Sequence, residues 1–303
     1  MLLSADILLT LQYEQFRLFG EYLATNREHD LERLQFGWTP SADMTVWVGR
    51  YHQLASVWNH EHHHGQYLQT SITRPAVENW EDDDGIIPQH HVGILVENHW
   101  HLAAGQTILT GLSGGYTAIV RKDGLEPFDG TDHRLGIQAR LAWLPNEMND
   151  SGVGLLFAAS HINADSMDGP LAIGALDHVD QHVLGVYGIY TADRWSMVSS
   201  VYGIDVTDVL RPGEDRAQFA AGYLQAELQV AYDVRGFARH EFTVNASDAQ
   251  YLRLFPSFAI ARTSVGARWD FTRRQALTVE VSDTHTLPNH FGELRLQWSA
   301  ALL

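Results

Sequence analysis

The sequence lacks cysteine, has a single lysine, carries few charged residues and has no long hydrophobic run. Without cysteine it can form neither disulfides nor thiolate metal or redox sites. Charged residues make up 19% of the 303 residues, below the roughly 25% of an average soluble domain. A transmembrane helix needs about 18 or more consecutive apolar residues. The sequence therefore predicts neither a transmembrane helix nor thiol chemistry.

The charge that is present is mostly negative. The net charge is −17, which disfavours nucleic acid and favours cationic or neutral partners. Because Lys122 is the only lysine, every other fixed cation is an arginine. Apolar residues still make up 45% of the chain, which is enough for a large buried or lipid-facing surface.

Alternation of apolar and polar residues with a period of two dominates the chain. In RLGIQARLAW (134–143) and YLQAELQVAY (223–232) it lasts about ten residues, longer than the 5–6 residues of an ordinary soluble strand. The polar faces carry glutamine, arginine and glutamate, and tryptophan or tyrosine lies towards strand ends. These features favour apolar side chains towards lipid and polar side chains towards a wet lumen. A soluble β-sandwich also alternates, with the opposite sense, and is the alternative fold.

The alternating segments predict about fifteen strands. Short connections, one of them NHWH at 98–101, alternate with long polar ones, which is typical of an outer-membrane barrel with short turns at one rim and long loops at the other. The expected strands are 5–14, 16–24, 31–39, 43–53, 90–98, 101–112, 133–144, 152–162, 181–191, 194–206, 217–231, 234–245, 258–272, 276–284 and 291–302.

Fifteen is an odd number, whereas single-chain bacterial barrels normally have an even number of strands. The first residues, MLLSADILLTLQYEQ, contain neither the basic segment nor the cleavage site of a signal peptide. We therefore expect sixteen strands in the complete protein if the N-terminus is truncated, with one more strand and a signal peptide encoded upstream. Residues 1–303 are expected to form a single β-barrel domain.

Three segments carry a resemblance to a known family. They are GWTPSADMTVWVGRYHQLASVWN (37–59), VGARWDFTRRQALTVEVS (265–282) and GELRLQWSAAL (292–302). They resemble proteobacterial porin-like outer-membrane proteins, in which a Gly-Arg strand end leads into a Trp-Asn loop start and three alternating strands close the barrel. The resemblance implies a transmembrane antiparallel up-and-down β-barrel in a Gram-negative outer membrane. The chain ends in Ala-Leu-Leu, where such proteins usually end in Phe or Trp.

The longest interval without alternation is 53–89, which is rich in histidine and aspartate. In a porin-like barrel, one such loop often folds inward and narrows the pore. Neutral imidazole binds zinc or copper, and carboxylates can complete the coordination shell. Two alternatives stay open: a solvated loop whose histidines bond to carboxylates, and a pH gate that works by histidine protonation. The candidate metal ligands are His60, His62, His64, His90 and His91.

The densest acidic patch is ENWEDDDG (78–85). Its carboxylates could raise the local cation concentration at a pore mouth or bind calcium. The alternative is an ordinary solvated patch, since its spacing does not match an EF-hand loop.

Charged residues on the polar faces are candidates for the pore lining. Opposed charges across a narrow lumen make a transverse field that filters ions. Alternatively, these side chains pair along the wall and only stabilise the barrel. The candidates are Arg50, Arg134, Arg140, Glu227, Arg239, Arg268, Asp270, Glu280 and Arg295.

Catalytic patterns are weak, because the Ser160-His161 pair has no G-x-S-x-G motif around it. We therefore expect no enzyme and no required cofactor. The predicted function is a porin-like channel for passive diffusion of small hydrophilic solutes or cations through a charged constriction. The first alternative is a barrel that captures zinc or copper or is gated by them, and the second is an outer-membrane hydrolase. The expected partners are outer-membrane lipid and small hydrophilic solutes or cations. The sequence is compatible with an oligomer, and no nucleic-acid partner is expected.

Overall fold

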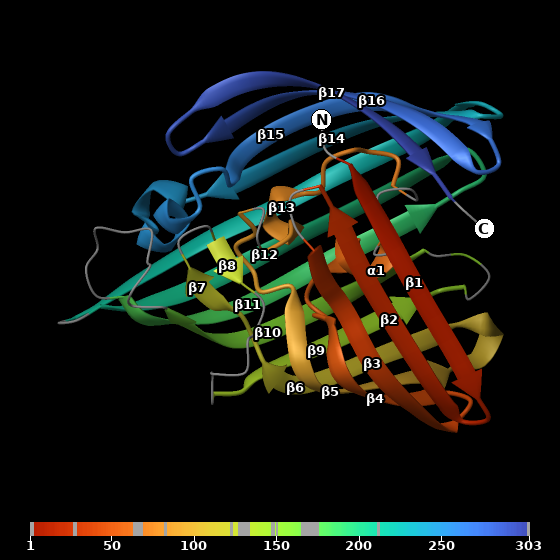
Figure 1. Ribbon diagram of the computed structural model, residues 1–303, viewed down its shortest axis with the longest axis horizontal. Helices are drawn as coiled ribbons and strands as arrows, with labels where there is room; N and C mark the ends of the chain where they lie inside the picture. Colours follow the sequence, from red (N-terminus) through yellow and green to blue (C-terminus); the bar gives the residue numbers. More distant parts are fainter. Residues whose placement is uncertain are drawn as a thin grey trace.

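The computed structural model describes residues 3–26, 29–62, 69–81, 84–121, 124–126, 134–146, 149, 151–164, 176–210 and 213–301. One large curved sheet forms the molecule and surrounds the segment between β4 and β5 (Figure 1). Its strands are β1 (Ser4–Tyr13), β2 (Phe16–Thr25), β3 (His29–Ser41), β4 (Met44–His52), β5 (His90–His101), β6 (Thr107–Tyr116), β7 (Ile119–Arg121), β8 (Gly124–Glu126), β9 (Gly136–Leu144), β10 (Gly152–Ala164), β11 (Leu176–Thr191), β12 (Trp195–Leu210), β13 (Gly213–Ala231), β14 (Val234–Val244), β15 (Ala259–Thr272), β16 (Gln275–Thr286) and β17 (His290–Ala300).

Fifteen strands, all except the short β7 and β8, form the wall, and each runs antiparallel to the next along the chain. The small hairpin of β7 and β8 belongs to the connection between β6 and β9, and β7 extends the edge of β10. Within the described residues no pairing joins β1 to β17, so the sheet is not closed. The predicted all-β, up-and-down, antiparallel arrangement with about fifteen strands is confirmed. The sixteenth strand stays a prediction.

The wall has its apolar side outward. On β16, Thr278, Glu280 and Ser282 are buried, whereas Val279 and Val281 between them are exposed. Leucine, valine and tryptophan side chains are exposed in the same way along most of the wall. In water this surface would be unfavourable by about 25 cal/mol per Å², whereas lipid tails accept it. The predicted sense of the alternation is therefore confirmed, and it is opposite to that of a soluble sandwich.

The predicted turn at 98–101 was wrong. His99 and His101 continue the ladder of β5 and pair with Leu109 and Thr107 of β6. The chain reverses later, at 102–106, where Ala104 and Gly105 adopt left-handed backbone angles (φ 60° and 71°). Such a turn depends on left-handed backbone angles, which glycine adopts readily. The polar composition of NHWH does not indicate where these angles occur.

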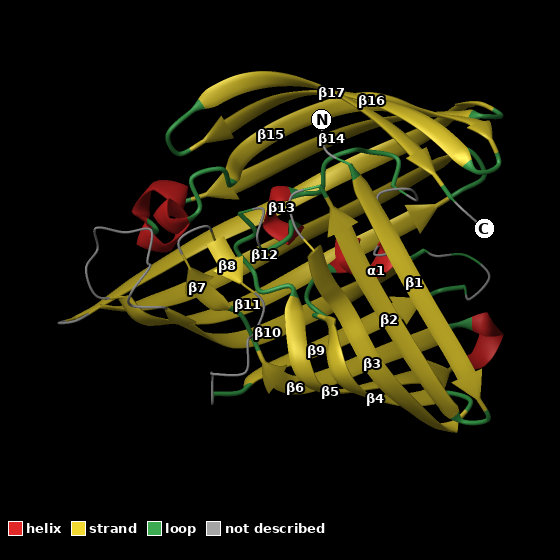
Figure 2. Cartoon of the chain, in the orientation of Figure 1, coloured by secondary structure: helices red, strands yellow, loops and turns green. Residues whose placement is uncertain are grey.

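Helices are few and short. They are α1 (Val57–His62), η1 (Ala76–Glu78), η2 (Ala103–Gly105), η3 (Ala246–Asp248) and η4 (Gln250–Leu254). Figure 2 shows α1 and η1 within the curve of the sheet. None of the helices in the described part of the chain has the length and apolar character needed to cross a membrane.

The outward face gives a first testable prediction. Val186 lies near the middle of β11, on the outward face, and is exposed. Replacing it with arginine should destabilise the folded protein by about 2–4 kcal/mol, the penalty for a cation near the bilayer midplane. Urea-induced unfolding in lipid vesicles measures the change. Tyr232, at a short turn, is the matched control: Tyr232→Arg should change stability by about 0–1 kcal/mol, and an equal loss at both positions would contradict a lipid-facing Val186.

Candidate functional site: a loop bound inside the barrel

The connection between β4 and β5 lies inside the curve of the wall. Its apolar side chains Leu54, Val57, Trp58, Ile86 and Ile87 are at most 3% exposed. All except Leu54 pack in one core cluster with inward-facing residues of the wall, such as those of β12 and β13. Leu54 packs in a second cluster with Tyr51 and Leu95. The described parts of this loop, 53–62, 69–81 and 84–89, thus fold inward, as one loop of a porin-like barrel often does, and are not an extracellular loop.

Arg239 of β14 is the central contact between loop and wall. Its side chain is fully buried, and it donates from Nε to Glu241 (2.9 Å) and from Nη1 to Gln225 (3.0 Å) on the wall. On the loop side, Nη1 donates to Ser71 Oγ (3.1 Å) and to the carbonyl of Thr73 (2.8 Å). One buried guanidinium therefore joins the wall to the bend of the loop at 71–73.

Two buried carboxylates of the wall accept hydrogen bonds from the loop backbone. Glu280 of β16 accepts from the amides of Ile72 (2.7 Å) and Thr73 (3.0 Å). Glu241 of β14 accepts from the amide of Ala76 (2.6 Å). Backbone N–H groups that enter a dry interior need such acceptors. The loop is thus held by its main chain as well as by its side chains.

The acidic patch at 78–85 is partly inside the protein, which corrects the expectation of a solvated surface. Glu78 and Glu81 are 0% and 1% exposed. Glu78 accepts hydrogen bonds from Ser56 Oγ (2.7 Å), Trp58 N (2.6 Å) and Tyr202 OH (2.7 Å). Burial raises the pKa of Glu78 above its ordinary value, and these donors oppose the rise. Sequence alone cannot distinguish these acids from solvated ones, because their burial results from strands of the wall that are distant in the sequence.

Other predicted lining residues also contact the loop or their strand neighbours. Glu227 accepts from Thr70 Oγ1 (2.8 Å). Arg268 donates to the carbonyl of Gln69 (2.8 Å) and pairs with Asp270 (2.8 Å). The three residues and Glu280 thus line the inner face where the loop is bound.

The remaining predicted lining residues have partners on or near their own strands. Arg140 donates to the hydroxyl of Tyr187 (2.8 Å), and Arg50 pairs with Asp30 (2.9 Å). Arg295 pairs with Glu293 (3.0 Å), and Arg134 lies 3.4 Å from the imidazole of His161. Of the two interpretations left open by the sequence, these contacts match pairing along the wall.

Below the loop, the structure contains a cavity of about 260 Å³ at the short-turn rim. Thr70 of the loop, Glu227, Arg235 and the turn at 191–194 line it. It gives the inner surface a polar, charged opening on the side opposite to the long loops.

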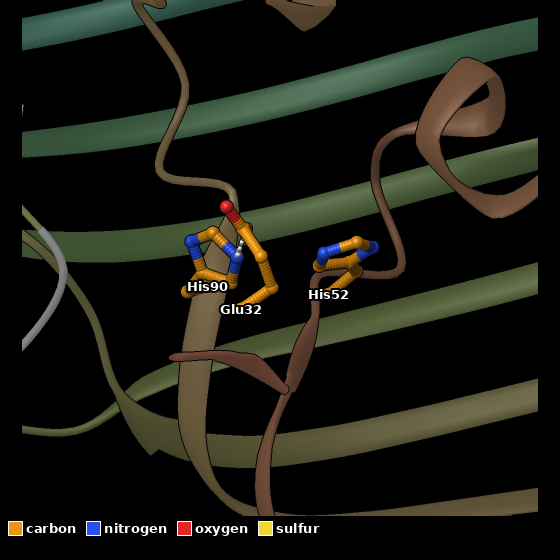
Figure 3. Close-up of side chains that lie close together, drawn as sticks. All are labelled: Glu32, His52 and His90. Atoms are coloured by element: carbon orange, nitrogen blue, oxygen red, sulfur yellow. Dashed lines mark ion pairs between the residues drawn. The ribbon is translucent and has the colours of Figure 1, made fainter. Parts of the chain in front are cut away.

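A second cluster, of histidine and glutamate, lies where the loop leaves the strands. Glu32, His52 and His90 bring ligand-type atoms within 4.8 Å of one another, and all three residues are buried (Figure 3). His90 Nε2 is 3.0 Å from Glu32 Oε2, and His90 Nδ1 is 3.2 Å from Glu81 Oε2. Imidazole and carboxylate groups are the donors that zinc and copper use. Among the described residues two further groups have similar geometry, His161 with His178 and Asp180, and Asp283 with His285 and His290, but only in the cluster of Glu32, His52 and His90 are all three residues buried.

The predicted metal ligands are only partly represented in this cluster. His90 belongs to it, whereas His91 is the next residue of β5 and, because strand residues alternate, points to the other side and lies beside Tyr51. The side chains of His60 and His62, and the whole of His64, lie outside the described residues.

Sequence reasoning missed Glu32 as a site residue. Leu34, Phe36 and Trp38 face outward, so strict alternation would place Glu32 on the apolar face. The register shifts between the Glu21–Arg33 and Leu23–Asp30 pairs, and Glu32 is buried in the cluster. A glutamate at an apolar position of the pattern was the available signal for this β-bulge.

Comparisons with known proteins find similarity in structure only. No protein-family model matches the sequence, and no curated protein matches it. The outer-membrane channel DcaP of Acinetobacter baumannii is 9% identical, with a TM-score of 0.61 over 98% of this chain and 83% of that one. The anion-selective porin of Comamonas acidovorans is 11% identical, with a TM-score of 0.61 over 98% and 85%. The trimer form of OmpT, an outer-membrane protein of Vibrio cholerae, is 11% identical, with a TM-score of 0.57 over 94% and 81%. The chain has the fold of a bacterial outer-membrane porin.

Proposed function

We propose that the protein is a porin-like channel of the outer membrane through which small hydrophilic solutes diffuse passively. The observation that carries this proposal is the loop bound inside the barrel by Arg239, Glu241 and Glu280. A loop held inside the lumen narrows it without requiring any chemistry. The charged opening beside Glu227 gives solutes an entrance at the short-turn rim.

We further propose that the channel prefers cations. The net charge is −17 with only one lysine, and acidic groups line the lumen along with the arginines. Fixed charge at a constriction raises the concentration of the opposite ion and excludes the like ion. One of the similar structures is an anion-selective porin, so selectivity has to come from the lining of this chain and not from the fold.

Conductance in a planar lipid bilayer tests the proposal. Purified, folded protein should give stable ohmic steps, and a KCl gradient should give a reversal potential with the sign of a cation preference. If the chain assembles like OmpT in its trimer form, the steps should come in groups of three. Folded protein that gives no conductance steps would contradict the proposed channel. A reversal potential with the sign of an anion preference would contradict the proposed cation selectivity.

Two matched variants locate the selective charge. Glu227→Gln removes a carboxylate from the lumen, and Asp283→Asn removes one from the exposed outward face. Both change the net charge by the same amount. The reversal potential should fall towards zero for Glu227→Gln and stay unchanged for Asp283→Asn. Equal shifts in both variants would mean that the charge of the whole protein, and not the lumen, sets selectivity.

A further inference from the structure

We propose that Glu32, His52 and His90 bind one divalent transition-metal ion, zinc(II) or copper(II), inside the barrel, and that Glu81 positions His90 for this. The site differs from the stretch of consecutive histidines in the loop. It joins strands β3, β4 and β5 at the point where the loop begins and ends. The proposal does not depend on whether the protein conducts ions.

The geometry is close to that of a bound ion. The ligand-type atoms of the three residues lie within 4.8 Å of one another, and the Nε2 of His90 and the Oε2 of Glu32 are 3.0 Å apart. Bonds of about 2.0–2.1 Å to a tetrahedral zinc place ligand atoms about 3.4 Å apart. His90 and Glu32 are already within this separation, so binding an ion requires an adjustment only of His52. Two imidazoles and one carboxylate leave a fourth position for water.

The fourth group, Glu81, occupies the place of an orienting partner. Its Oε2 lies 3.2 Å from Nδ1 of His90, and its Oε1 accepts the amide of His90 (2.9 Å) and the amide of Gln89. A metal-bound histidine usually donates its second ring N–H to a carboxylate, which fixes the ring and strengthens it as a ligand. Glu81 does this for His90 and leaves Nε2 directed at Glu32.

The charge around the cluster favours a cation. Glu32 and Glu81 are two buried acids, and Asp6 lies within electrostatic range of Glu32. Two arginines, Arg50 and Arg74, lie within electrostatic range of Glu32. Arg50 is already paired with Asp30, so Arg74 is the cation that opposes the negative charge of these acids. A divalent ion balances this excess of acid, and the proton on Nε2 of His90 leaves to solvent when the ion binds.

Titration calorimetry with zinc chloride on the detergent-purified, full-length protein tests the site. Wild type should bind one ion at saturation. His52→Ala and Glu32→Gln should each weaken binding by about 100-fold or more, and Glu81→Gln by about 10–100-fold, the effect of losing an orienting carboxylate. Folding of each variant is checked by the heat-dependent shift in gel mobility that folded barrels show.

Two controls separate this site from the exposed cluster at His285 and from the loop histidines. His285→Ala alters an exposed cluster on the outward face, and a variant with His60, His62, His63 and His64 all replaced by asparagine alters the loop. Both should bind zinc like wild type. Loss of binding in either control, or unchanged binding in His52→Ala, overturns the proposal.

A measurement on wild type alone covers the case in which the ligand variants do not fold. X-ray absorption at the zinc edge should show two imidazoles and no more, and three or more would place the ion on the loop histidines. The ring of Trp80 stacks on that of His90, with 5.8 Å between the ring centroids and 1° between the ring planes. Copper(II) should therefore quench its fluorescence, and Trp80→Phe should remove that part of the quenching while zinc still binds.

Discussion

Arg239→Ala is expected to release the middle of the loop from the wall and to increase the single-channel conductance. The substitution leaves Glu280 in the interior without the guanidinium that balances it and leaves Glu241 with Arg262 alone. It also removes the bonds to Ser71 and Thr73. Removing one partner of a buried ion pair costs about 3–5 kcal/mol. The ratio of bound to released loop should therefore fall by about a hundredfold to a few thousandfold.

Conductance in a planar bilayer and proteolysis of the loop measure this release. Arg216→Ala is the control, because Arg216 lies on the neighbouring strand β13, its side chain is 66% exposed and it pairs with Asp205 away from the loop. An exposed pair contributes about 0–1 kcal/mol, so this variant should conduct like wild type. Unchanged conductance and unchanged loop cleavage in Arg239→Ala would show that the loop is held by other contacts.

Glu78→Ala should destabilise the loop on its other side. The hydroxyls of Ser56 and Tyr202 and the amide of Trp58 would lose their common acceptor in a dry interior. Each buried donor left unpaired costs about 1–3 kcal/mol, so the expected loss for three donors is about 3–9 kcal/mol. Chemical denaturation followed by tryptophan fluorescence measures it. Asp84 is the control: it is partly exposed and accepts one bond, from the amide of Ser257, so Asp84→Ala should cost less.

The same residue gives the loop a pH dependence. Burial raises the pKa of Glu78 above its unfolded value, so the folded state holds the proton more tightly. Its contribution to stability is fully present below the unfolded pKa, about 4.3, and is lost as the pH rises through the higher folded pKa. Glu78→Gln removes the titrating group, so this slope should disappear. A slope that persists in Glu78→Gln would assign it to another group.

Much of the fold could be predicted from the sequence, because alternation is a local signal that lipid and lumen both enforce. The expected strands 152–162 and 234–245 correspond to β10 (Gly152–Ala164) and β14 (Val234–Val244). Errors arose where the pattern carries no information. The hairpin of β7 and β8 is too short to alternate, and the turn after His101 depends on backbone angles at Ala104 and Gly105.

The candidate site was harder to predict, since it consists of contacts between distant parts of the chain. The polar side of β14 marks Arg239 as inward-facing, but nothing in the sequence indicates that it binds Thr73, 166 positions away. The histidines around 53–89 predicted a metal site, which stays a proposal. Its position at Glu32 and His52 depended on a β-bulge and on a pairing of strand ends that periodicity does not encode.

The bound loop also has a mechanical consequence. It is attached to Gln138 on β9, Gln181 on β11, Tyr202 on β12, Arg239 on β14 and Glu280 on β16. It therefore braces the inner side of the wall from β9 to β16 and resists a change in the curvature of this part of the sheet. Under lateral pressure from the bilayer, the arc from β9 to β16 should keep its curvature, and elastic deformation should concentrate in β1 to β3.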